Sequence, residues 1–341
     1  MISKEDLETI KSYLEKAENP LFLYDDDNDG LCSYLLFKKF CGKGKGVIVK
    51  ARPHVDEFFV HRVNEYNPDI VFILDKPIVK QEFIDNVNVP IVWLDHHPPS
   101  DVKGVKYFNP LLKKKDGHGM STSYWCYKAV GGELWIATVG TISDWVVPEW
   151  MDEFKKKYPG MVEDMKTPEK ILFETKLGKL CRLFSFFTRG KISDIKDNIK
   201  LIEKIEDPNE ILDCSSDAGK RLVKNIEKIK KEFDKLLVNA IKSVTEDKLF
   251  IFTYVSRNYS FTSDISNELV YRFPNKFIIV GREKEGEIKM SLRSEKYKVR
   301  DILEEALEKV EGYGGGHEKA CGANVAVGDF DKFTEIIKKK L

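Results

Sequence analysis

Several features that are common in proteins are scarce in this chain. Among its 341 residues there is one glutamine, Gln81, whereas Lys, Arg, Asp and Glu together make up 33%. A chain so rich in charge and so poor in glutamine is typical of thermophilic proteins. The six cysteines lie far apart, and no two of them form a C-x-x-C pair. This spacing argues against zinc clusters and a disulfide framework, so we expect reduced, mostly buried thiols.

The chain also lacks a net charge and long apolar runs. Its 56 basic residues balance its 56 acidic ones, so any binding of nucleic acid must use a local groove. There is no run of 18 apolar residues and no signal peptide, which predicts a cytoplasmic protein without a membrane span. A hydrophobic content of 42% over this length supports two domains with cores of their own.

What the chain does have is a crowded acidic stretch, LYDDDNDGLCS, at residues 23–33. An EF-hand calcium loop shares its D-x-D-x-D-G spacing, but such a loop needs a Glu at the twelfth position, which here is Leu36. It should also follow a helix, whereas this stretch follows PLFLY, an apolar run typical of a strand. We therefore expect a catalytic metal site at the end of a strand, where cations neutralise the aspartates.

Four short apolar runs in the first part of the chain are typical of strands buried on both faces of a parallel sheet. Segments with helical patterns lie between them, and this alternation predicts a doubly wound α/β sheet. The runs are PLFLY (20–24), GVIVKA (46–51), DIVFIL (69–74) and PIVWL (90–94).

Three of these runs lead directly into acidic residues or histidines. The first is followed by the acidic stretch, the third by Asp75, and the fourth by the triplet Asp95-His96-His97. A further element, LWIATVGTISD, carries Asp144 after a Gly-Thr turn. A single Asp after a strand is usually a helix N-cap. Four such sites favour a ligand site instead, because open α/β sheets bind ligands at the carboxyl ends of their strands.

The type and number of these side chains indicate the metal. Carboxylates with few imidazoles suit manganese or magnesium better than zinc. There are more acids than one ion needs, and they fit two ions held roughly 4 Å apart, the arrangement used for in-line attack on phosphorus. The sequence therefore predicts two Mn²⁺ ions, or Mg²⁺ in their place.

The second half of the chain predicts helices followed by another α/β domain. Residues 150–215 have helical patterns, and residues 217–244 read as one long amphipathic helix that connects the domains. The strands LFIFTYV, KFIIVG and EIKMSLRS and the helix ISNELVYRF come next. We expect a catalytic domain over 1–190, a helical linker over 191–246 and a smaller α/β domain over 247–341, with the active site in the cleft between the domains.

The four acidic motifs, in this order, resemble those of the DHH phosphoesterase family, and RecJ-like nucleases in particular. RecJ nucleases carry Asp at the first position of D-x-D-x-D-G, as here, where other branches usually carry His. The C-terminal part resembles the small DHH-associated domain through MSLRS and GYGGGHEKACGA. The resemblance therefore involves both ends of the chain.

The resemblance implies a role for each matching residue. Asp95 and His97 are expected to be catalytic, with His97 contacting the scissile phosphate. The expected metal ligands are Asp25, Asp27, Asp29, Asp75, His96 and Asp144. The expected grip on the substrate is formed by Ser291, Arg293, Gly314, Gly315, Gly316 and His317. Consecutive glycines expose backbone N–H groups to a phosphate, and an Arg fork offers two parallel hydrogen bonds, although GGGH by itself reads as a hairpin turn.

The resemblance also implies a metal-dependent phosphodiesterase. The first interpretation is a RecJ-like exonuclease that hydrolyses single-stranded DNA or RNA from an end and has replication or repair proteins as partners. The alternative is a nanoRNase-like hydrolase of short oligonucleotides, dinucleotides or 3′-phosphoadenosine 5′-phosphate. A third interpretation is a non-catalytic replication scaffold, but such proteins typically lose metal ligands, and all six are present here.

Overall fold

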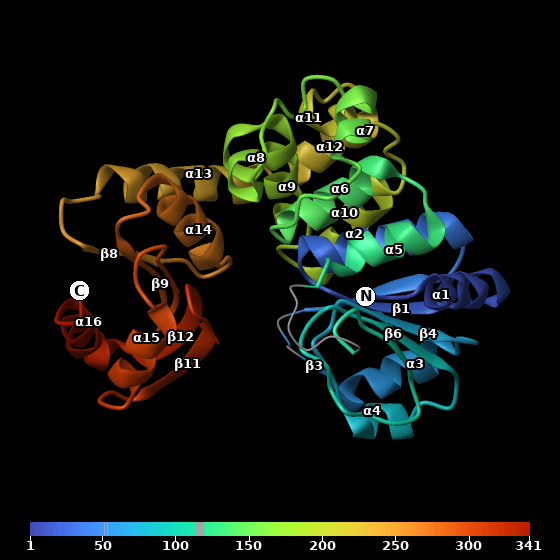
Figure 1. The fold of residues 1–341 in the computed structure, drawn as a ribbon, viewed down its shortest axis with the longest axis horizontal. Helices are drawn as coiled ribbons and strands as arrows, with labels where there is room; N and C mark the ends of the chain where they lie inside the picture. Colours follow the sequence, from blue (N-terminus) through green and yellow to red (C-terminus); the bar gives the residue numbers. More distant parts are fainter. Residues whose placement is uncertain (51, 53, 113–118) are drawn as a thin grey trace. The chain divides into compact units, whose positions relative to one another are not determined.

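A computed structural model of the chain describes residues 1–50, 52, 54–112 and 119–341. Within these ranges no helix combines the length and the apolar character that crossing a membrane requires. The chain forms two compact units, one of residues 1–188 with 192–225 and one of residues 189–191 with 226–341 (Figure 1). The segment 191–246, expected as a linker, is shared between these units.

The first unit contains a five-stranded sheet in the order β2-β1-β4-β6-β7, in which every neighbouring pair is parallel. The chain order reverses between β1 and β4, which is the point where such sheets bind ligands. The four predicted strands are all present. The bounds are β1 Leu21–Asp25, β2 Lys45–Val49, β4 Val71–Leu74, β6 Ile91–Leu94 and β7 Lys106–Phe108, with β3 His54–Val55 and β5 Ile78–Val79 in a small second sheet.

Helices cover both faces of the larger sheet (Figure 1). Helices α2 (Asn28–Cys41) and α5 (Thr122–Val130) lie on one face, and α3 (Val60–Tyr66) and α4 (Gln81–Asp85) on the other. Because successive strand residues point to opposite faces, Phe72 meets Phe37 of α2 at 6.0 Å between ring centroids. On the opposite face, strand residues such as Leu23 and Trp93 pack with Val63 and Phe83. The predicted doubly wound α/β fold is thus confirmed.

Further helices complete the first unit, as expected for residues 150–215. Helix α9 (Lys176–Phe187) buries most of its apolar side chains, among them Leu180 and Phe184. The bounds are α1 Lys4–Lys16, η1 Glu57–Phe59, α6 Leu134–Ser143, α7 Met151–Lys157, α8 Pro168–Glu174, α9 Lys176–Phe187, α10 Ile192–Ile202, α11 Asn209–Leu212 and α12 Asp217–Asn225.

Two sequence-based expectations about helices were wrong. The stretch 217–244 is two helices, α12 and α13 (Glu227–Lys242), because Ile226 between them has φ −99° and ψ 3° and does not continue the helix. The segment before Asp144 is helix α6 and not a Gly-Thr turn. Its Gly140 lies inside the helix, where an added Cβ would come within 2.4 Å of Ser123 Oγ in α5. Gly140 therefore permits close packing of α6 on α5 and does not end the helix.

The second unit contains a five-stranded sheet in the order β11-β12-β10-β9-β8. Only β8 and β9 pair in parallel among these strands, and the other pairs are antiparallel. The strands and the helix predicted for this region are present. The bounds are α13 Glu227–Lys242, β8 Leu249–Val255, α14 Thr262–Arg272, β9 Phe277–Lys284, β10 Glu287–Arg293, α15 Val299–Leu307, β11 Gly312–His317, β12 Ala320–Ala326, η2 Val327–Asp329 and α16 Phe330–Lys338.

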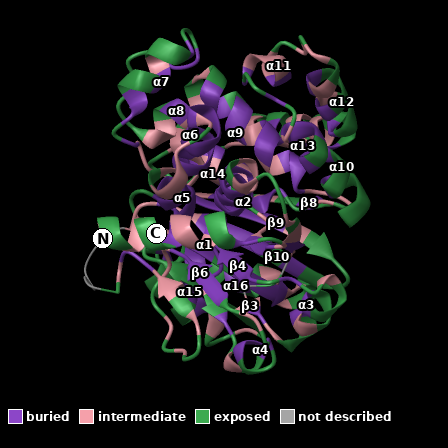
Figure 2. Ribbon diagram, turned by 90° about the vertical axis from the view of Figure 1, so that its right-hand side faces the viewer, coloured by how far each residue is buried: buried purple, intermediate pink, exposed green. Residues whose placement is uncertain are grey.

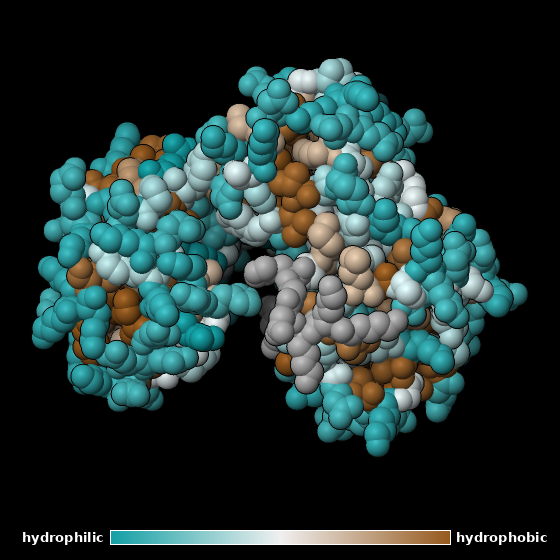
Figure 3. Space-filling model, viewed as in Figure 1, coloured by the Kyte–Doolittle hydropathy of each residue, from teal (hydrophilic) through white to brown (hydrophobic). Residues whose placement is uncertain are grey.

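Burial follows these layers. All residues of β4 and β6 are buried, and their ribbons are coloured accordingly in Figure 2. In the second unit, β9 and β10 pack on α15 and α16 through residues such as Phe277, Leu292, Leu303 and Phe333. The face seen in Figure 3 is mainly hydrophilic on each unit, with scattered apolar residues, which is ordinary for a chain with this charge content.

Candidate metal centre

The register of the first sheet brings three acidic segments to one edge. Tyr24 pairs with Leu74, and Leu74 pairs with Leu94. Each of these three residues is followed in the chain by an aspartate, namely Asp25, Asp75 and Asp95. Since parallel strands share one carboxyl edge, these aspartates leave the sheet at the same level, beside the point where the strand order reverses.

The acidic stretch folds as the end of β1 and the first turn of α2. Asp27 is the N-cap of α2, and its side chain accepts a hydrogen bond of 2.9 Å from the backbone N–H of Gly30. The start of the helix packs so closely on the strand end that a Cβ at Gly30 would lie 2.7 Å from backbone atoms of Asp25. The glycine of D-x-D-x-D-G is therefore required by this close approach.

Asp29 is held by the N-terminus of another helix. Its two carboxylate oxygens accept hydrogen bonds from the backbone N–H groups of Thr122 (2.7 Å) and Ser123 (2.8 Å) at the start of α5. The partial positive charge of a helix N-terminus favours a carboxylate here. The side chain is only 2% exposed, so these two hydrogen bonds satisfy both oxygens of a buried side chain.

Asp75 lies at the centre of the acidic cluster. Its side chain is 1% exposed and accepts a hydrogen bond of 3.1 Å from the Thr122 hydroxyl. Its backbone has φ 61°, in the left-handed region that Asp and Asn tolerate better than bulky residues. Burial and then the charges of Asp29 and Asp27 raise the pKa of Asp75 well above its usual range.

His96 links the acids of different segments. Its Nε2 lies 3.4 Å from an oxygen of Asp75 and 3.9 Å from one of Asp29, and its Nδ1 lies 3.6 Å from Asp144. Asp144 reaches the cluster as the C-cap of α6. Burial and then the charge of Asp29 raise the pKa of Asp144 to about 9. Asp144, which we expected after a Gly-Thr turn, therefore lies at the end of helix α6.

Three groups of side chains bring their ligand atoms within 4.8 Å of one another and could each hold a metal ion. Asp75 and His96 each belong to two of the groups, so neighbouring ions would share ligands. Together the groups contain all six expected ligands and also His97. They are Asp25 with Asp27 and Asp75, Asp29 with His96 and Asp144, and Asp75 with His96 and His97.

Asp95 lies behind His97 and is completely buried. One of its oxygens lies 2.8 Å from His97 Nδ1, and the other accepts from the backbone N–H of His97 and from Asn109 Nδ2. Burial alone lowers the pKa of His97, but the hydrogen bond and charge of Asp95 raise it overall. Asp95 therefore positions the imidazole, whose side chain is 36% exposed and can face a substrate.

Lys76 is a member of this site that the sequence analysis missed. Its side chain is 1% exposed, and its ammonium donates to Asp25 Oδ1 at 2.8 Å and to the backbone carbonyl of Arg52 at 2.6 Å. Burial and then the charge of Asp27 raise the pKa of Asp25 to about 7, with Lys76 acting in the opposite direction. Its position directly after Asp75 was the only signal in the sequence.

The side chains fit a pair of divalent cations. Carboxylates crowded into one buried cluster repel one another unless positive charge lies beside them. Lys76 supplies only one such charge. Oxygen ligands with one or two imidazoles suit Mn²⁺ or Mg²⁺. The chemistry of the donor set therefore agrees with the metal that the sequence predicted.

The expected substrate-binding residues lie in the second unit. Arg293 already donates to its own unit, to Asn267 Oδ1 (2.7 Å), Ser263 Oγ (3.2 Å) and two backbone carbonyls. Ser291 is buried, and its hydroxyl donates to Thr262 Oγ1 at 3.1 Å. Their role in binding phosphate stays a prediction, since most of the N–H groups of Arg293 already donate within this unit.

The GGGH segment forms β11, an edge strand of the five-stranded sheet in the second unit. All six residues of the strand are exposed, and it pairs only with β12 among the described strands. A Cβ at Gly315 would meet no atom within 4 Å, whereas Gly316 has φ 146° and an added Cβ would lie 2.5 Å from Ala320 O. Gly314–Gly316 and His317 thus present a free backbone edge, and their role as a grip stays a prediction.

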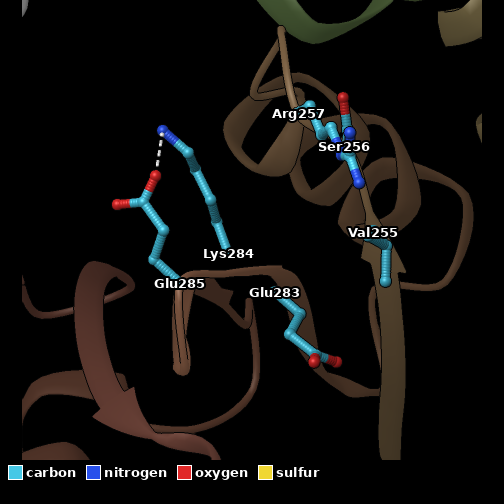
Figure 4. Close-up of a pocket in the computed structure, with 6 residues that line it drawn as sticks. All are labelled: Val255, Ser256, Arg257, Glu283, Lys284 and Glu285. Carbon is cyan, nitrogen blue, oxygen red and sulfur yellow. Dashed lines mark ion pairs between the residues drawn. The ribbon is translucent and has the colours of Figure 1, made fainter.

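One pocket of the second unit contains none of the expected site residues. It has a volume of about 470 Å³ and lies between the end of β8 and the turn from β9 to β10. Figure 4 shows its lining, in which Lys284 and Glu285 form an ion pair of 3.1 Å. The lining is Val255, Ser256, Arg257, Glu283, Lys284 and Glu285. With charges of both signs and no cluster of ligands, it offers no reactive centre.

Known proteins share this architecture. Residues 246–341 match the DHHA1 domain family, and no curated protein sequence matches the chain. A manganese-bound exonuclease RecJ superposes with a TM-score of 0.67 and 14% identity, covering 100% of this chain and 94% of that one. The manganese complex of RecJ from Thermus thermophilus gives 0.67 and 15%, covering 98% of this chain and 54% of that one.

A third similar structure is the pGpG-specific phosphodiesterase PggH from Vibrio cholerae. It superposes with a TM-score of 0.53 and 15% identity, covering 95% of this chain and 98% of that one. Identities this low establish a common fold. The chain therefore has a two-domain fold similar to that of these RecJ structures, and its C-terminal part matches the DHHA1 domain family, as the sequence motifs predicted.

Proposed function

We propose that this chain is a phosphodiesterase dependent on Mn²⁺ or Mg²⁺ that hydrolyses single-stranded DNA or RNA from an end. The observation that carries the proposal is the sharing of Asp75 and His96 between ligand groups. Shared ligands are what two adjacent cations need. Two cations held by these groups would stabilise the attacking and leaving oxygens of a phosphoryl displacement.

The protein's own residues have separate tasks in this proposal. The acids and His96 of the three ligand groups would hold the cations, and Asp29 is in turn fixed by α5. Asp95 fixes His97 through Nδ1, which leaves Nε2 available for the phosphate oxygen. Water adds across one P–O bond, so that one product carries the phosphate monoester and the other a hydroxyl. Two RecJ structures with this fold hold Mn²⁺, which supports that metal.

The alternative substrate is a very short one: an oligonucleotide, a dinucleotide or 3′-phosphoadenosine 5′-phosphate. It is supported by the match to PggH, a pGpG-specific enzyme whose chain is covered to 98%. The Thermus RecJ is covered only to 54%, so nearly half of that long chain has no counterpart here. Association with replication or repair proteins and a cytoplasmic location stay predictions.

The test is a cleavage assay over substrate length. End-labelled single-stranded DNA and RNA from a dinucleotide to about thirty nucleotides, with pGpG included, are incubated with Mn²⁺, Mg²⁺ or EDTA. Degradation of long strands from one end supports the exonuclease. Cleavage confined to dinucleotides and trinucleotides supports the alternative, and no cleavage of any substrate contradicts both.

Asp75→Asn is the matched inactive variant. Asn tolerates the left-handed backbone of this position and keeps the side-chain shape, so the fold should be retained. Losing a ligand shared by two groups should lower the cleavage rate by roughly a thousandfold. Asp101→Asn, in an exposed loop, controls for a general loss of charge. Full activity of Asp75→Asn would show that the site has been placed wrongly.

A further inference from the structure

Helix α6 ends in a common helix-ending motif, but one position of this motif holds an unusual residue. Val146 N–H bonds to Thr141 O (3.2 Å) and Trp145 N–H bonds to Ile142 O (3.0 Å). These two bonds define a Schellman motif, which places the residue after the C-cap in the left-handed conformation. That residue is Trp145, with φ 61°. Glycine normally occupies this position because it has no Cβ to clash.

Packing of the indole does not account for this choice. Trp145 is 39% exposed, whereas the nearby tryptophans Trp135 and Trp150 are buried. Its ring meets Phe173 of α8 with centroids 6.0 Å apart and planes tilted by 58°. Phe173 is itself half-buried. The result is an aromatic surface that keeps one part in contact with the protein and another part open to solvent.

The position of this surface relative to the metal centre is set by the chain. Trp145 directly follows Asp144, which belongs to a ligand group with Asp29 and His96. Consecutive Cα atoms are about 3.8 Å apart, so the indole begins within one residue of the cluster. Strained backbone at a bulky residue occurs preferentially at functional sites, where the surrounding structure compensates for its cost.

We propose that Trp145 is the stacking platform for the nucleobase next to the scissile phosphate, with Phe173 bracing the indole. The inference rests on the proposed function and deepens it by assigning a residue to base recognition. Aromatic rings bind bases of any sequence, because every base has a π face. Trp145 therefore supplies affinity for nucleotides over simple phosphodiesters without selecting a particular base.

The test compares nucleotide and abasic substrates in two Trp145 variants. Trp145→Leu keeps apolar contact with Phe173 but has no flat ring, whereas Trp145→Tyr keeps a ring. Both retain the strained backbone, so that cost cancels between them. Phe40→Leu is the control, because Phe40 is an exposed aromatic residue of α2 about 16 Å along the helix from Asp29.

Binding is measured in the Asp75→Asn background with Mn²⁺, using a dinucleotide and its abasic analogue, and KM and kcat are measured in the active protein. We expect Trp145→Leu to weaken dinucleotide binding and raise KM by about 5- to 150-fold, with kcat and abasic binding nearly unchanged. Trp145→Tyr should recover most of the loss, and Phe40→Leu should have no effect.

The outcomes separate this inference from the proposed function. Equal weakening for nucleotide and abasic ligands, or no weakening in Trp145→Leu, would overturn the stacking role even in an active enzyme. Base-dependent binding in a protein that cleaves nothing would support the platform while contradicting the proposed hydrolysis. A fall in kcat alone would mean that Trp145 acts by positioning Asp144, which also overturns the inference.

Discussion

The two units of this protein differ in how their candidate functional side chains are surrounded. At the carboxyl edge of the first sheet, Asp75 and its neighbours are buried together with raised pKa values. In the second unit Arg293 is surrounded by acceptors from its own fold. The first site needs cations from outside, whereas Arg293 already makes most of its hydrogen bonds within its own unit.

This difference teaches how to interpret a cluster of charges in a fold. Like charges collected at one place cost stability unless something binds there, so their presence indicates a ligand. A cation with good partners costs little and can be structural. The predictions below test whether the two units really differ in this way.

The largest effect is expected from removing the buried ammonium of the first unit. Lys76→Met leaves Asp25 without its ion-pair partner, which should lower the free energy of unfolding by about 3 kcal/mol. Because Lys76 also orients Asp25, Mn²⁺ affinity should fall by about 10- to 100-fold, measured by titration calorimetry. Lys80→Met, at an exposed position, is the control. Unchanged Mn²⁺ affinity would mean that Asp25 binds no metal.

The second prediction concerns pH and stability without metal. The folded-state pKa values of Asp25 and Asp144 are raised to about 7 and about 9, above the unfolded value. Protonation therefore stabilises the folded state fully below about pH 4, and this stability is lost as pH rises through the folded pKa values. In EDTA, Tm should fall by an amount on the order of 5 °C between about pH 6 and about pH 9.

Mn²⁺ and Asp75→Asn sharpen this experiment. Protons compete with metal for the same carboxylates, so the increase in Tm caused by Mn²⁺ should grow with pH. Asp75→Asn removes one of the crowded charges and should flatten the pH dependence in EDTA. A metal-free Tm that rises steadily with pH would contradict the assigned pKa directions.

A smaller effect is expected in the second unit. Arg293→Lys cannot reach Asn267, Ser263 and the two carbonyls at once, so it should lower the stability of this unit by about 1–3 kcal/mol. Hydrogen exchange of the full chain, followed over 249–293, localises the loss. Arg300→Lys, an exposed arginine, is the control. Full stability combined with lost substrate affinity would show that Arg293 serves only the ligand.

The smallest effect compares two neighbouring glycines of β11. Gly316→Ala should cost about 1 kcal/mol or more, because its backbone is strained for any side chain. Gly315→Ala meets no atom and should change stability by less than about 0.5 kcal/mol. A loss of activity in Gly315→Ala at full stability would therefore report a substrate at this edge. Equal destabilisation of both variants would contradict the strand geometry.

Much of the first unit was readable from the chain because its signals are local. The strands of the sheet are short apolar runs, and Asp75 and the triplet after β6 follow them directly. The prediction failed where the pattern was ambiguous. The apolar residues before Asp144 form helix α6, which composition could not reveal because a short buried helix and a buried strand have the same composition. The break at Ile226 had no proline or glycine to mark it.

The sequence by itself determined that acids and histidines would gather at the carboxyl edge of a parallel sheet, because strand direction and the position of each acid are both local properties. Only the tertiary structure decided which side chain meets which. Lys76 reaches Asp25, α5 receives Asp29, and Arg293 is enclosed by its own unit. These contacts join residues from 26 to 94 positions apart, and no local pattern encodes a distance between segments that only packing brings together.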